Sequence, residues 1–368
     1  MLSTRVRWAE RLLGSAIIAR RCRQRIRKLS RELPIVEQPG LSRAVSRRFD
    51  GYSCDLWHKV YAAASGRHCI DYVPEDLFVN VFENRLNPRK RKELYKDKNH
   101  YDRLNWSCLP ETIFRIINGR MFDKSYQLID VASALKIARK SGLEEFVVKP
   151  ARDTGGGSRV SFLPFDELAT FIPSELKEQS DWIIQHPVVQ HEVMAALHPH
   201  AVNTIRIVTI RMGAAIFVVS AFVRIGAGTS RVDNLTPGKG IGVGVQGDGR
   251  LRKYGYNLRY KRFTKHPDYG YEVEGFELPS FDAAQRTCIS LHQTIPELDL
   301  ISWDVAIGHD GHPIVLEFNV RRPDIGHSQV CNGPVLTPFI DAVLARRKWH
   351  MIPGIGAIDE VDADAIAA

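Results

Sequence analysis

The sequence contains little that could span a membrane, cross-link a small fold or bind a transition metal. The apolar stretch Leu12–Ala19 is far shorter than the roughly 18 residues that a membrane helix needs. Six cysteines are scattered along 368 residues, and no two of them form a C-x-x-C pair. Neither a zinc site nor a disulfide framework is therefore indicated, and we expect a reducing, cytoplasmic location.

Several common catalytic signatures are also missing. The sequence has no G-x-x-x-x-G-K-[ST] loop and no G-x-G-x-x-G between a strand and a helix, which removes the support for a P-loop or a Rossmann nucleotide site. It has thirteen histidines but no H-E-x-x-H, and it lacks the G-x-S-x-G turn that presents a nucleophilic serine. Chemistry that depends on a protein nucleophile or on a zinc-bound water is therefore not favoured.

Positive charge is concentrated at the N-terminus. Residues 1–48 contain thirteen Arg and Lys residues but only three acids, whereas the remaining 320 residues are close to neutral. A neutral body gives no support for nucleic-acid binding. The basic segment has two interpretations that the sequence leaves open. It is either a helix face exposed to solvent or a contact with an anionic membrane surface or an acidic partner. The second would place a cytoplasmic protein at the membrane periphery.

Helices dominate the first part of the chain. Residues 5–32 have a helical pattern that Pro34 and the Pro39–Gly40 pair end. Further helices are predicted over residues 53–64, 74–86, 88–105 and 130–141. We therefore expect a basic helical arm over residues 1–48, followed by a mostly helical region over residues 49–140.

Strands dominate the rest of the chain. Asn203–Met212 and Ala215–Val223 are predicted to be strands, and Gly213 between them favours a hairpin. Asp248-Gly249 favours a second tight turn. Other strands are predicted over residues 146–149, 160–163, 182–185, 188–193, 300–307 and 314–318, and helices over 281–293 and 334–347. The fold class is therefore α+β, and the small, acidic residues 349–368 are expected to form a flexible tail.

Lys149 and the glycines that follow it form the first candidate site. Lys149 ends a predicted strand, and Gly155, Gly156, Gly157 and Ser158 follow within ten residues. Successive glycines let backbone N–H groups approach a phosphate closely, and a nearby lysine supplies a positive charge. A glycine-rich hairpin without any ligand has the same pattern, so the residues alone do not decide between the two.

Three oxygen-bearing side chains near the C-terminus form the second candidate site. Glu317 and Asn319 are two residues apart on a predicted strand and point to the same side, and Asp304 lies on the preceding strand. Carboxylate and amide oxygens suit Mg²⁺ rather than zinc or copper. Because the flanking residues are apolar, the carboxylates need a metal or a basic partner, for which Arg206 is a candidate. A structural salt bridge is therefore the alternative to a magnesium site.

Taken in chain order, these motifs resemble the ATP-grasp superfamily. The series consists of Lys98 in Lys96–His100, Lys149 in Val-Val-Lys-Pro, the glycine loop, Gln190–Val193, Asn203-Thr-Ile-Arg206, Asp304 and Glu317-Phe-Asn319. More narrowly, the chain is similar to the sugar-transfer-associated ATP-grasp proteins over about residues 50–345. That resemblance rests on Tyr72–Leu77, Asn203–Val208, Asp233-Asn234 and the stretch from Asn319 through Pro323 to Gln329.

The resemblance implies an ATP-grasp fold, in which two α+β lobes clasp ATP behind the helical N-terminal region. The small lobe would cover residues 141–195, and the large lobe, with the metal site, residues 196–348. The resemblance implies that Lys98 and Lys149 contact phosphate oxygens while Gly155–Ser158 covers them. It also implies that Gln190 and Glu192 lie near adenine and ribose.

The resemblance also implies the roles of the remaining site residues. Asp304, Glu317 and Asn319 would hold one or two Mg²⁺ ions, for which Mn²⁺ could substitute. Arg206 and Lys149 would be the catalytic cations. Asn203, Arg321 and Arg322 are candidates for substrate contacts. Adjacent arginines suit a carboxylate or a sugar acid, although a solvated turn has the same pattern.

The activity that the resemblance implies is that of an ATP- and Mg-dependent carboxylate–amine ligase. A substrate carboxylate would attack the γ-phosphate to give an acyl phosphate, and an amine would then displace phosphate. The substrates would be a small-molecule or glycan carboxylate and an amine acceptor, in polysaccharide or secondary-metabolite biosynthesis. A small-molecule kinase and a non-catalytic nucleotide-binding partner of a glycan-assembly system are the alternatives on the same fold.

Overall fold

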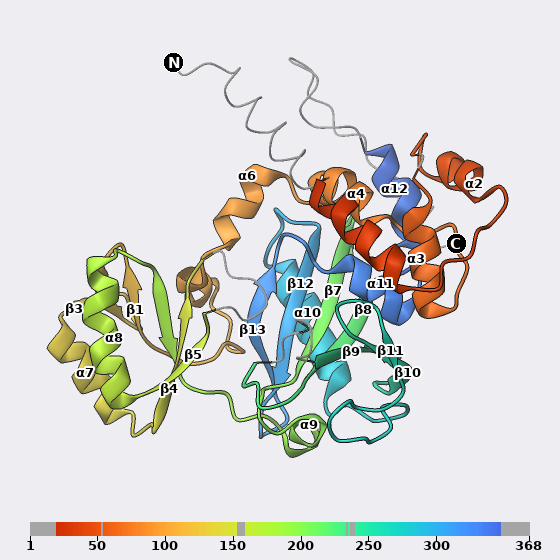
Figure 1. Ribbon diagram of the computed structural model, residues 1–368. Helices are drawn as coiled ribbons and strands as arrows, with labels where there is room; N and C mark the ends of the chain where they lie inside the picture. Colours follow the sequence, from red (N-terminus) through yellow and green to blue (C-terminus); the bar gives the residue numbers. More distant parts are fainter. Residues whose placement is uncertain (1–19, 53, 153–158, 233–234, 236–239, 347–368) are drawn as a thin grey trace, which may run out of the picture.

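The computed structural model describes residues 20–52, 54–152, 159–232, 235 and 240–346. These residues form two antiparallel β-sheets with helices packed around them (Figure 1). The smaller sheet lies at the left of the view, and the larger sheet forms the centre of the remaining structure. The predictions for Gly155–Ser158, Asp233-Asn234 and the tail over residues 349–368 fall outside the described residues.

Helices make up the first part of the described chain, as predicted. They are residues 20–32, α2 (Leu41–Arg48), α3 (Leu56–Ser65), α4 (Glu75–Leu77), α5 (Glu83–Leu86) and α6 (Arg89–Lys92). A π-helical turn, Phe78–Phe82, joins α4 to α5. Within the described ranges, each helix is too short or too polar to pass through a lipid bilayer.

The helix predicted over residues 88–105 is broken in the structure. After α6 the chain forms two 3-10 segments, Glu93–Tyr95 and Lys98–Leu104. Asp97 between them has an extended backbone, and its side chain accepts a hydrogen bond from the N–H of Asn99. Such an N-cap begins a new helical turn and separates it from the preceding one. The interruption places Lys98 at the start of its own segment.

The smaller sheet has six strands in the order β3-β2-β1-β6-β4-β5. The strands are β1 (Thr112–Ile117), β2 (Arg120–Asp123), β3 (Leu128–Ile129), β4 (Glu145–Pro150), β5 (Ser161–Pro164) and β6 (Trp182–Gln185). Two helices, α7 (Val131–Lys140) and α8 (Phe165–Lys177), pack against this sheet. Phe114, Phe146 and Ile184 are buried in the core between them.

Strands β1 to β3 correct the expectation of a mostly helical region up to residue 140. Thr112–Ile117 is a short apolar run, and Asn118-Gly119 after it forms a tight turn in which both residues have positive φ, 49° and 67°. Asn-Gly is the strongest short hairpin signal in a sequence. These strands pair in one sheet with β4 to β6, so the smaller sheet begins at residue 112, ahead of the boundary predicted at residue 141.

The larger sheet has seven strands in the order β11-β10-β9-β8-β7-β12-β13. The strands are β7 (Thr204–Met212), β8 (Ala215–Gly226), β9 (Gly240–Val245), β10 (Leu251–Tyr256), β11 (Arg262–Phe263), β12 (Leu300–Ile307) and β13 (Pro313–Asn319). The segment before this sheet, expected to be extended over residues 188–193, turns into the helix α9 (Glu192–Leu197). The closing helix α12 (Ile340–Ala345) follows a 3-10 turn, Thr337–Phe339, and is shorter than predicted.

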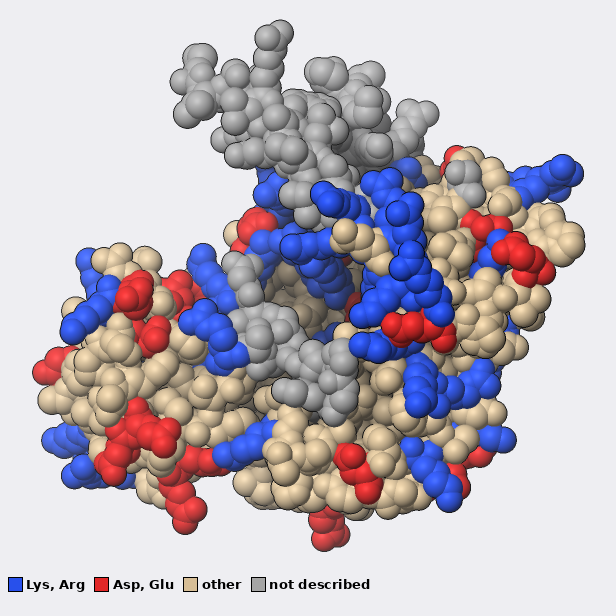
Figure 2. Space-filling view, viewed as in Figure 1, with Lys and Arg blue, Asp and Glu red and all other residues tan. Residues whose placement is uncertain are grey.

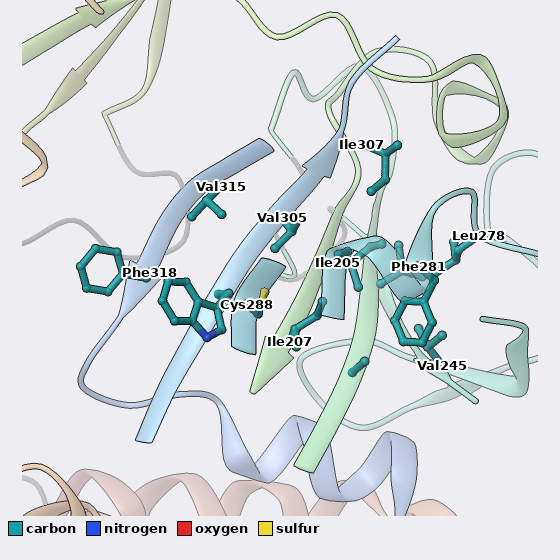
Figure 3. Close-up of a cluster of buried hydrophobic side chains, with 14 of the residues drawn as sticks. Ile205, Ile207, Val245, Leu278, Phe281, Cys288, Val305, Ile307, Val315 and Phe318 are labelled. Carbon is teal, nitrogen blue, oxygen red and sulfur yellow. The ribbon is translucent and has the colours of Figure 1, made fainter. Parts of the chain in front are cut away.

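Helices cover both faces of the larger sheet. On one face, α10 (Phe281–Gln293) buries Phe281 and Cys288 against side chains of β7 and β12, including Ile205 and Val305 (Figure 3). A helix that the sequence analysis did not anticipate, α11 (Ile325–Asn332), packs against β8, β9 and β10. The strand residues that pack against α10 point to one face of the sheet, so the residues between them in sequence point to the opposite face.

Strand alternation therefore decides where the polar residues of this sheet lie. Arg206 falls between the core residues Ile205 and Ile207, so it points to the face opposite α10. Asp304 is the cross-strand partner of Arg206, and Glu317 is the cross-strand partner of Asp304. Directly opposed residues share a face, so these three charged side chains are neighbours on one surface of the sheet.

Candidate functional site

Asp304 is the centre of a buried ion-pair cluster. Arg206 donates from Nε to Oδ1 and from Nη2 to Oδ2, both at 2.8 Å. Arg224 on the neighbouring strand β8 places Nη2 3.1 Å from Oδ2, and Asn319 donates to the same oxygen at 3.3 Å. Burial raises the pKa of the Asp304 carboxyl, but the charges of Arg206 and Arg224 outweigh burial and lower the pKa to about 2.

Glu317 pairs with a lysine from outside the sheet. Nζ of Lys98 lies 2.9 Å from Oε1 of Glu317. Lys149 arrives from β4 of the smaller sheet, and its Nζ donates to the carbonyl of Leu316 at 3.3 Å. Burial and the charge of Lys98 lower the pKa of Lys149 to about 8, against the opposing effect of Glu317. Lys98 and Lys149 thus reach β13, the strand that carries Glu317, from two elements outside the larger sheet.

A cavity of about 710 Å³ opens beside these residues. Part of its wall is formed by Lys98, Arg206, Arg224, Glu317 and Asn319. Another part is formed by the N-terminal helix, residues 20–32, and by the loop over residues 321–324 that follows β13. The space-filling view shows a hollow in this side of the molecule with Lys and Arg side chains gathered around it (Figure 2).

Cations outnumber acids in the wall of this cavity. The basic residues that line it are Arg21, Arg25, Lys96, Lys98, Arg206, Arg224, Arg321 and Arg322, and the acids are Glu75, Glu317 and Asp324. Since like charges gathered in a low-dielectric cleft raise the local concentration of the opposite ion, the cavity favours anionic ligands.

A buried cluster closes the cavity beside the N-terminal helix. Arg25 donates to both oxygens of Glu75, at 2.6 and 2.8 Å, and to the hydroxyl of Tyr260 at 3.0 Å. The Tyr260 hydroxyl donates to Oε1 of Glu75 at 2.9 Å. Burial raises the pKa of Glu75, although Arg25 lowers it in part. Gly326 approaches so closely that an added Cβ would lie 1.9 Å from Oε1 of Glu75.

The structure does not bring every residue expected in the site to the cavity. The side chain of Gln190 donates to the carbonyl of Ala201 at 2.7 Å and accepts from the N–H of Asn203 at 3.0 Å. Asn203 is fully buried, and its amide donates to backbone carbonyls of Met194 and His198. Both side chains therefore hold together the segment of residues 190–203 that precedes β7. Glu192 is exposed at the start of α9.

Other expected residues do meet at the cavity. Arg321 and Arg322, the candidates for substrate contacts, lie in its wall. The sequence analysis missed Arg224 and the part played by Arg21 and Arg25. Arg224 continues the alternation of β8 by one residue beyond the predicted strand end, which was the available signal. The role of the N-terminal helix had no local signal, because it depends on a contact with Glu75 and Tyr260 across long sequence separations.

The donor set of Asp304, Glu317 and Asn319 fits Mg²⁺ when phosphate oxygens complete the shell. All three contribute hard oxygen donors, which Mg²⁺ prefers, and few protein ligands are typical where nucleotide phosphates share the ion. In the described part of the chain, no group of three or more His, Cys, Asp and Glu side chains could hold a metal alone. Asp304 and Glu317 also form ion pairs, with Arg206 and Lys98. The magnesium site and the structural salt bridge, the two interpretations of the sequence, therefore involve the same carboxylate oxygens.

Comparisons with solved structures give distant similarities. The chain is 15% identical to PsnB, an ATP-grasp ligase complexed with a minimal precursor, with a TM-score of 0.39. The alignment covers 71% of this chain and 64% of PsnB. The chain is 13% identical to the D-cycloserine synthetase DcsG, with a TM-score of 0.43. The alignment covers 83% of this chain and 94% of DcsG. For the D-alanine–D-alanine ligase from Bacillus anthracis, the identity is 14%, the coverages are 68% and 67%, and the TM-score is 0.36. At these identities the similarities concern the fold alone.

A comparison with protein-family models gives a match to part of the chain. The model described as "Sugar-transfer associated ATP-grasp" matches residues 165–345, which include the whole of the larger sheet and the helices α10 to α12. A search of curated proteins found no match. Together with the ordered motifs, the match shows that the chain carries a sugar-transfer associated ATP-grasp domain, with an α+β ATP-grasp fold behind a helical N-terminal region.

Proposed function

We propose that the protein is an ATP- and Mg-dependent carboxylate–amine ligase that forms an acyl phosphate. ATP-grasp domains typically bind ATP with Mg²⁺, and the fold is typical of ADP-forming ligases. The observation that carries the proposal is the arrangement of Asp304, Glu317 and Asn319 on one sheet face, with Lys98 and Lys149 arriving beside Glu317. These residues combine oxygen ligands for a metal with cations for phosphates.

The charge of this cluster supports a nucleotide. Lys98, Lys149, Arg206 and Arg224 are cations, and the acids paired with or adjacent to them are Asp304, Glu317 and Asp324. The cluster therefore has one more positive than negative charge. A magnesium-bound nucleoside triphosphate has a net charge of about −2, which complements that excess.

Each part of the cluster has a separate task in the proposed reaction. Asp304, Glu317 and Asn319 would hold Mg²⁺, which neutralises charge on the phosphate oxygens. Lys98 and Lys149 would orient the phosphates, and Lys149 would bring the small lobe onto the nucleotide. Arg206 would stabilise the charge on the γ-phosphoryl group as it is transferred. Positioning and charge stabilisation account for most phosphoryl-transfer catalysis, so no protein nucleophile is needed.

The bond changes in the proposed reaction balance without a further reactant. A carboxylate oxygen of the acid forms a bond to the γ-phosphorus while the bond to the ADP oxygen breaks. The amine nitrogen then bonds to the acyl carbon, phosphate leaves with the electron pair of the C–O bond, and the amine loses a proton to water. We propose a small-molecule or glycan carboxylate as the acid, in polysaccharide or secondary-metabolite biosynthesis.

Release of ADP in the presence of candidate acids tests this function. We expect ADP and phosphate to appear only when an acid is added, and hydroxylamine to trap the acyl phosphate as a hydroxamate. Asp304→Asn should abolish both signals, whereas Asp310→Asn in the exposed β12–β13 turn should leave them unchanged. Formation of AMP and pyrophosphate, or of a stable phosphoester on a hydroxyl group, would contradict the proposal. The second outcome would instead identify a kinase.

A further inference from the structure

We infer that the cavity beside the N-terminal helix binds the acid substrate, and that this acid carries at least one anionic group besides the carboxylate that reacts. The inference rests on the proposed function for its reaction, but the binding site stands on its own observations. The ligand class is a compact polyanion, either a polycarboxylate or a phosphate-bearing carboxylate. Arg21, Arg321 and Arg322 would hold the additional anionic group.

The three arginines differ from the other cations in the cavity wall because their side chains form no ion pair with an acid of the described chain. Among the residues that the structure describes, neither Arg21 nor Arg321 nor Arg322 has an ion pair or a side-chain hydrogen bond. The other cations in the wall are engaged: Arg25 with Glu75, Lys96 with Glu93, Lys98 with Glu317, and Arg206 and Arg224 with Asp304. The cations of the cavity wall without an ion pair in the described part of the chain therefore come from two elements, the N-terminal helix and the loop over residues 321–324.

The two elements that carry these arginines are held in place by buried contacts. The N-terminal helix is fixed by Arg25, whose guanidinium is bonded to Glu75 and Tyr260. The loop after β13 is fixed at Arg322, whose N–H donates at 2.7 Å to Glu83, a buried acid that also pairs with Lys92. The arginines thus extend from a rigid frame, which reduces the entropy that a ligand must remove on binding.

The backbone of the loop is strained in a way that often marks a functional segment. Arg322 and Asp324 have positive φ, 49° and 60°, although neither is a glycine. Residues held in the left-handed region cost free energy and are concentrated in active sites and ligand clamps. Asp324 lies 3.8 Å from Nη1 of Arg206, so the strained loop joins the arginine side of the cavity to the proposed γ-phosphate site.

The arginines on the helix and on the loop act on the same space. Burial raises the pKa of the Cys22 thiol on the helix to about 11, with Glu75 and Asp76 adding to the increase, and Arg25 and Arg322 lower it in part. Arg322 of the loop is therefore within electrostatic range of the helix. Cys22 also lines the cavity between Arg21 and Arg25 in the chain.

The amount of unpaired charge sets the class of acid. A single reacting carboxylate brings one negative charge, and it loses that charge when it becomes an acyl phosphate. Three guanidinium groups that lack an ion pair among the described residues carry more charge than such a ligand could balance. A second carboxylate or a phosphate matches the planar, bidentate donor pattern of arginine and remains charged throughout the reaction.

Direct binding of small polyanions tests the site without relying on turnover. We would titrate the full chain, without nucleotide, with tricarballylate and with 3-phosphoglycerate, and use propionate as the monoanionic control. We expect the protein to bind one equivalent of polyanion. Binding of propionate should not reach saturation. Arg21→Gln and Arg322→Gln should each weaken binding on the order of 10-fold, because each removes a charge-assisted contact. A preference for one polyanion distinguishes a carboxylate from a phosphate as the additional group.

Matched variants separate this site from general electrostatics. Arg23→Gln removes the same charge from the same helix, at an exposed position that does not line the cavity, and should leave binding unchanged. Equal weakening by Arg23→Gln and Arg21→Gln would overturn the inference, as would binding that both cavity variants leave intact. Displacement of the polyanion by Mg-ADP would place it in the nucleotide site and would also overturn the inference.

The release of ADP gives the second arm of the test. Under the inference, acids with an additional anionic group stimulate ADP release at lower concentrations than matched monocarboxylates. Arg322→Gln should raise KM for the acid on the order of 10-fold with little change in kcat. If polyanions bind but no acid causes ADP release, the proposed ligase function fails and the anion site stands. If monocarboxylates are the better substrates, the inference fails and the ligase function stands.

Discussion

Arg206 and Asp304 face each other on β7 and β12, and the guanidinium donates one hydrogen bond to each carboxylate oxygen at 2.8 Å. The pair is buried, with Arg206 9% and Asp304 4% exposed, and Arg224 adds a second cation to the same carboxylate. A buried pair of this kind contributes to specific positioning more than to stability, because desolvation offsets much of the attraction. Its position next to Glu317 makes it the frame of the proposed metal site.

Removal of one partner from this pair should destabilise the protein. Arg206→Met leaves Asp304 with Arg224 as its ion-pair partner among the described residues, and we expect a loss of about 3 kcal/mol, at the low end for a broken buried pair. Urea denaturation measures the free energy of unfolding. Asp304→Asn in the Arg206→Met background should cost less than it does alone, since the same interaction is already lost. Strictly additive effects would show that the two side chains are not coupled.

Gly326 is expected to tolerate no side chain. An added Cβ would lie 1.9 Å from Oε1 of Glu75 and 2.5 Å from the Tyr260 hydroxyl, and both residues are buried. Gly326→Ala should therefore disrupt the contact of Arg25 with Glu75 and lower the free energy of unfolding by about 1–3 kcal/mol. Thermal denaturation measures the change. Gly247→Ala is the control, because its Cβ meets nothing within 4 Å. Equal melting temperatures for the two variants would contradict this geometry.

His292 should make stability depend on pH between about 4 and 6.5. Burial lowers its pKa from 6.5 to about 4, with Arg211 contributing and the carbonyl of Leu298 opposing. In this interval the unfolded chain binds a proton that the folded protein does not, so stability increases with pH. The contribution of the group is about 3 kcal/mol from the size of the shift. It is complete above pH 6.5 and lost as the pH falls.

A glutamine at this position isolates the contribution of His292. His292→Gln keeps polar atoms near Thr209, whose hydroxyl lies 2.7 Å from Nδ1 of His292, but it does not titrate. The variant should show a smaller decrease in the free energy of unfolding from pH 6.5 to pH 4.5, measured by urea denaturation at each pH. The same slope in both proteins would assign the pH dependence to other groups.

The sequence was most informative where alternation or an apolar run was long. Asn203–Met212 and Leu300–Ile307 correspond closely to β7 and β12, because a strand buried along nearly its whole length needs a long, mostly apolar run of residues. The period of two placed Glu317 and Asn319 on one side, with Asp304 and Arg206 as candidate neighbours, and the strand register sets Arg206, Asp304 and Glu317 opposite one another. The family resemblance depended on these elements, and the family match over residues 165–345 confirms it.

The parts that the sequence analysis missed depend on short elements and distant contacts. β3 has two residues, Leu128–Ile129, and offers no periodicity to detect. The helix α11 is buried on nearly all sides, so the amphipathic pattern that marks a surface helix is weak in Ile325–Asn332. The N-terminal helix is held beside the cavity by the ion pair of Arg25 with Glu75, and these two residues are 50 positions apart in the chain.

Calorimetric titration with ATP, with and without Mg²⁺, tests the central claim most directly. The wild-type chain should bind one equivalent of ATP more tightly when Mg²⁺ is present. Glu317→Gln should weaken binding at least about 10-fold in the presence of Mg²⁺ and remove most of the metal dependence, because a metal ligand is lost. Asp310→Asn, in the exposed turn between β12 and β13 and outside the cavity lining, is the control. Unchanged affinity and metal dependence in Glu317→Gln would contradict a nucleotide–magnesium site at Asp304, Glu317 and Asn319.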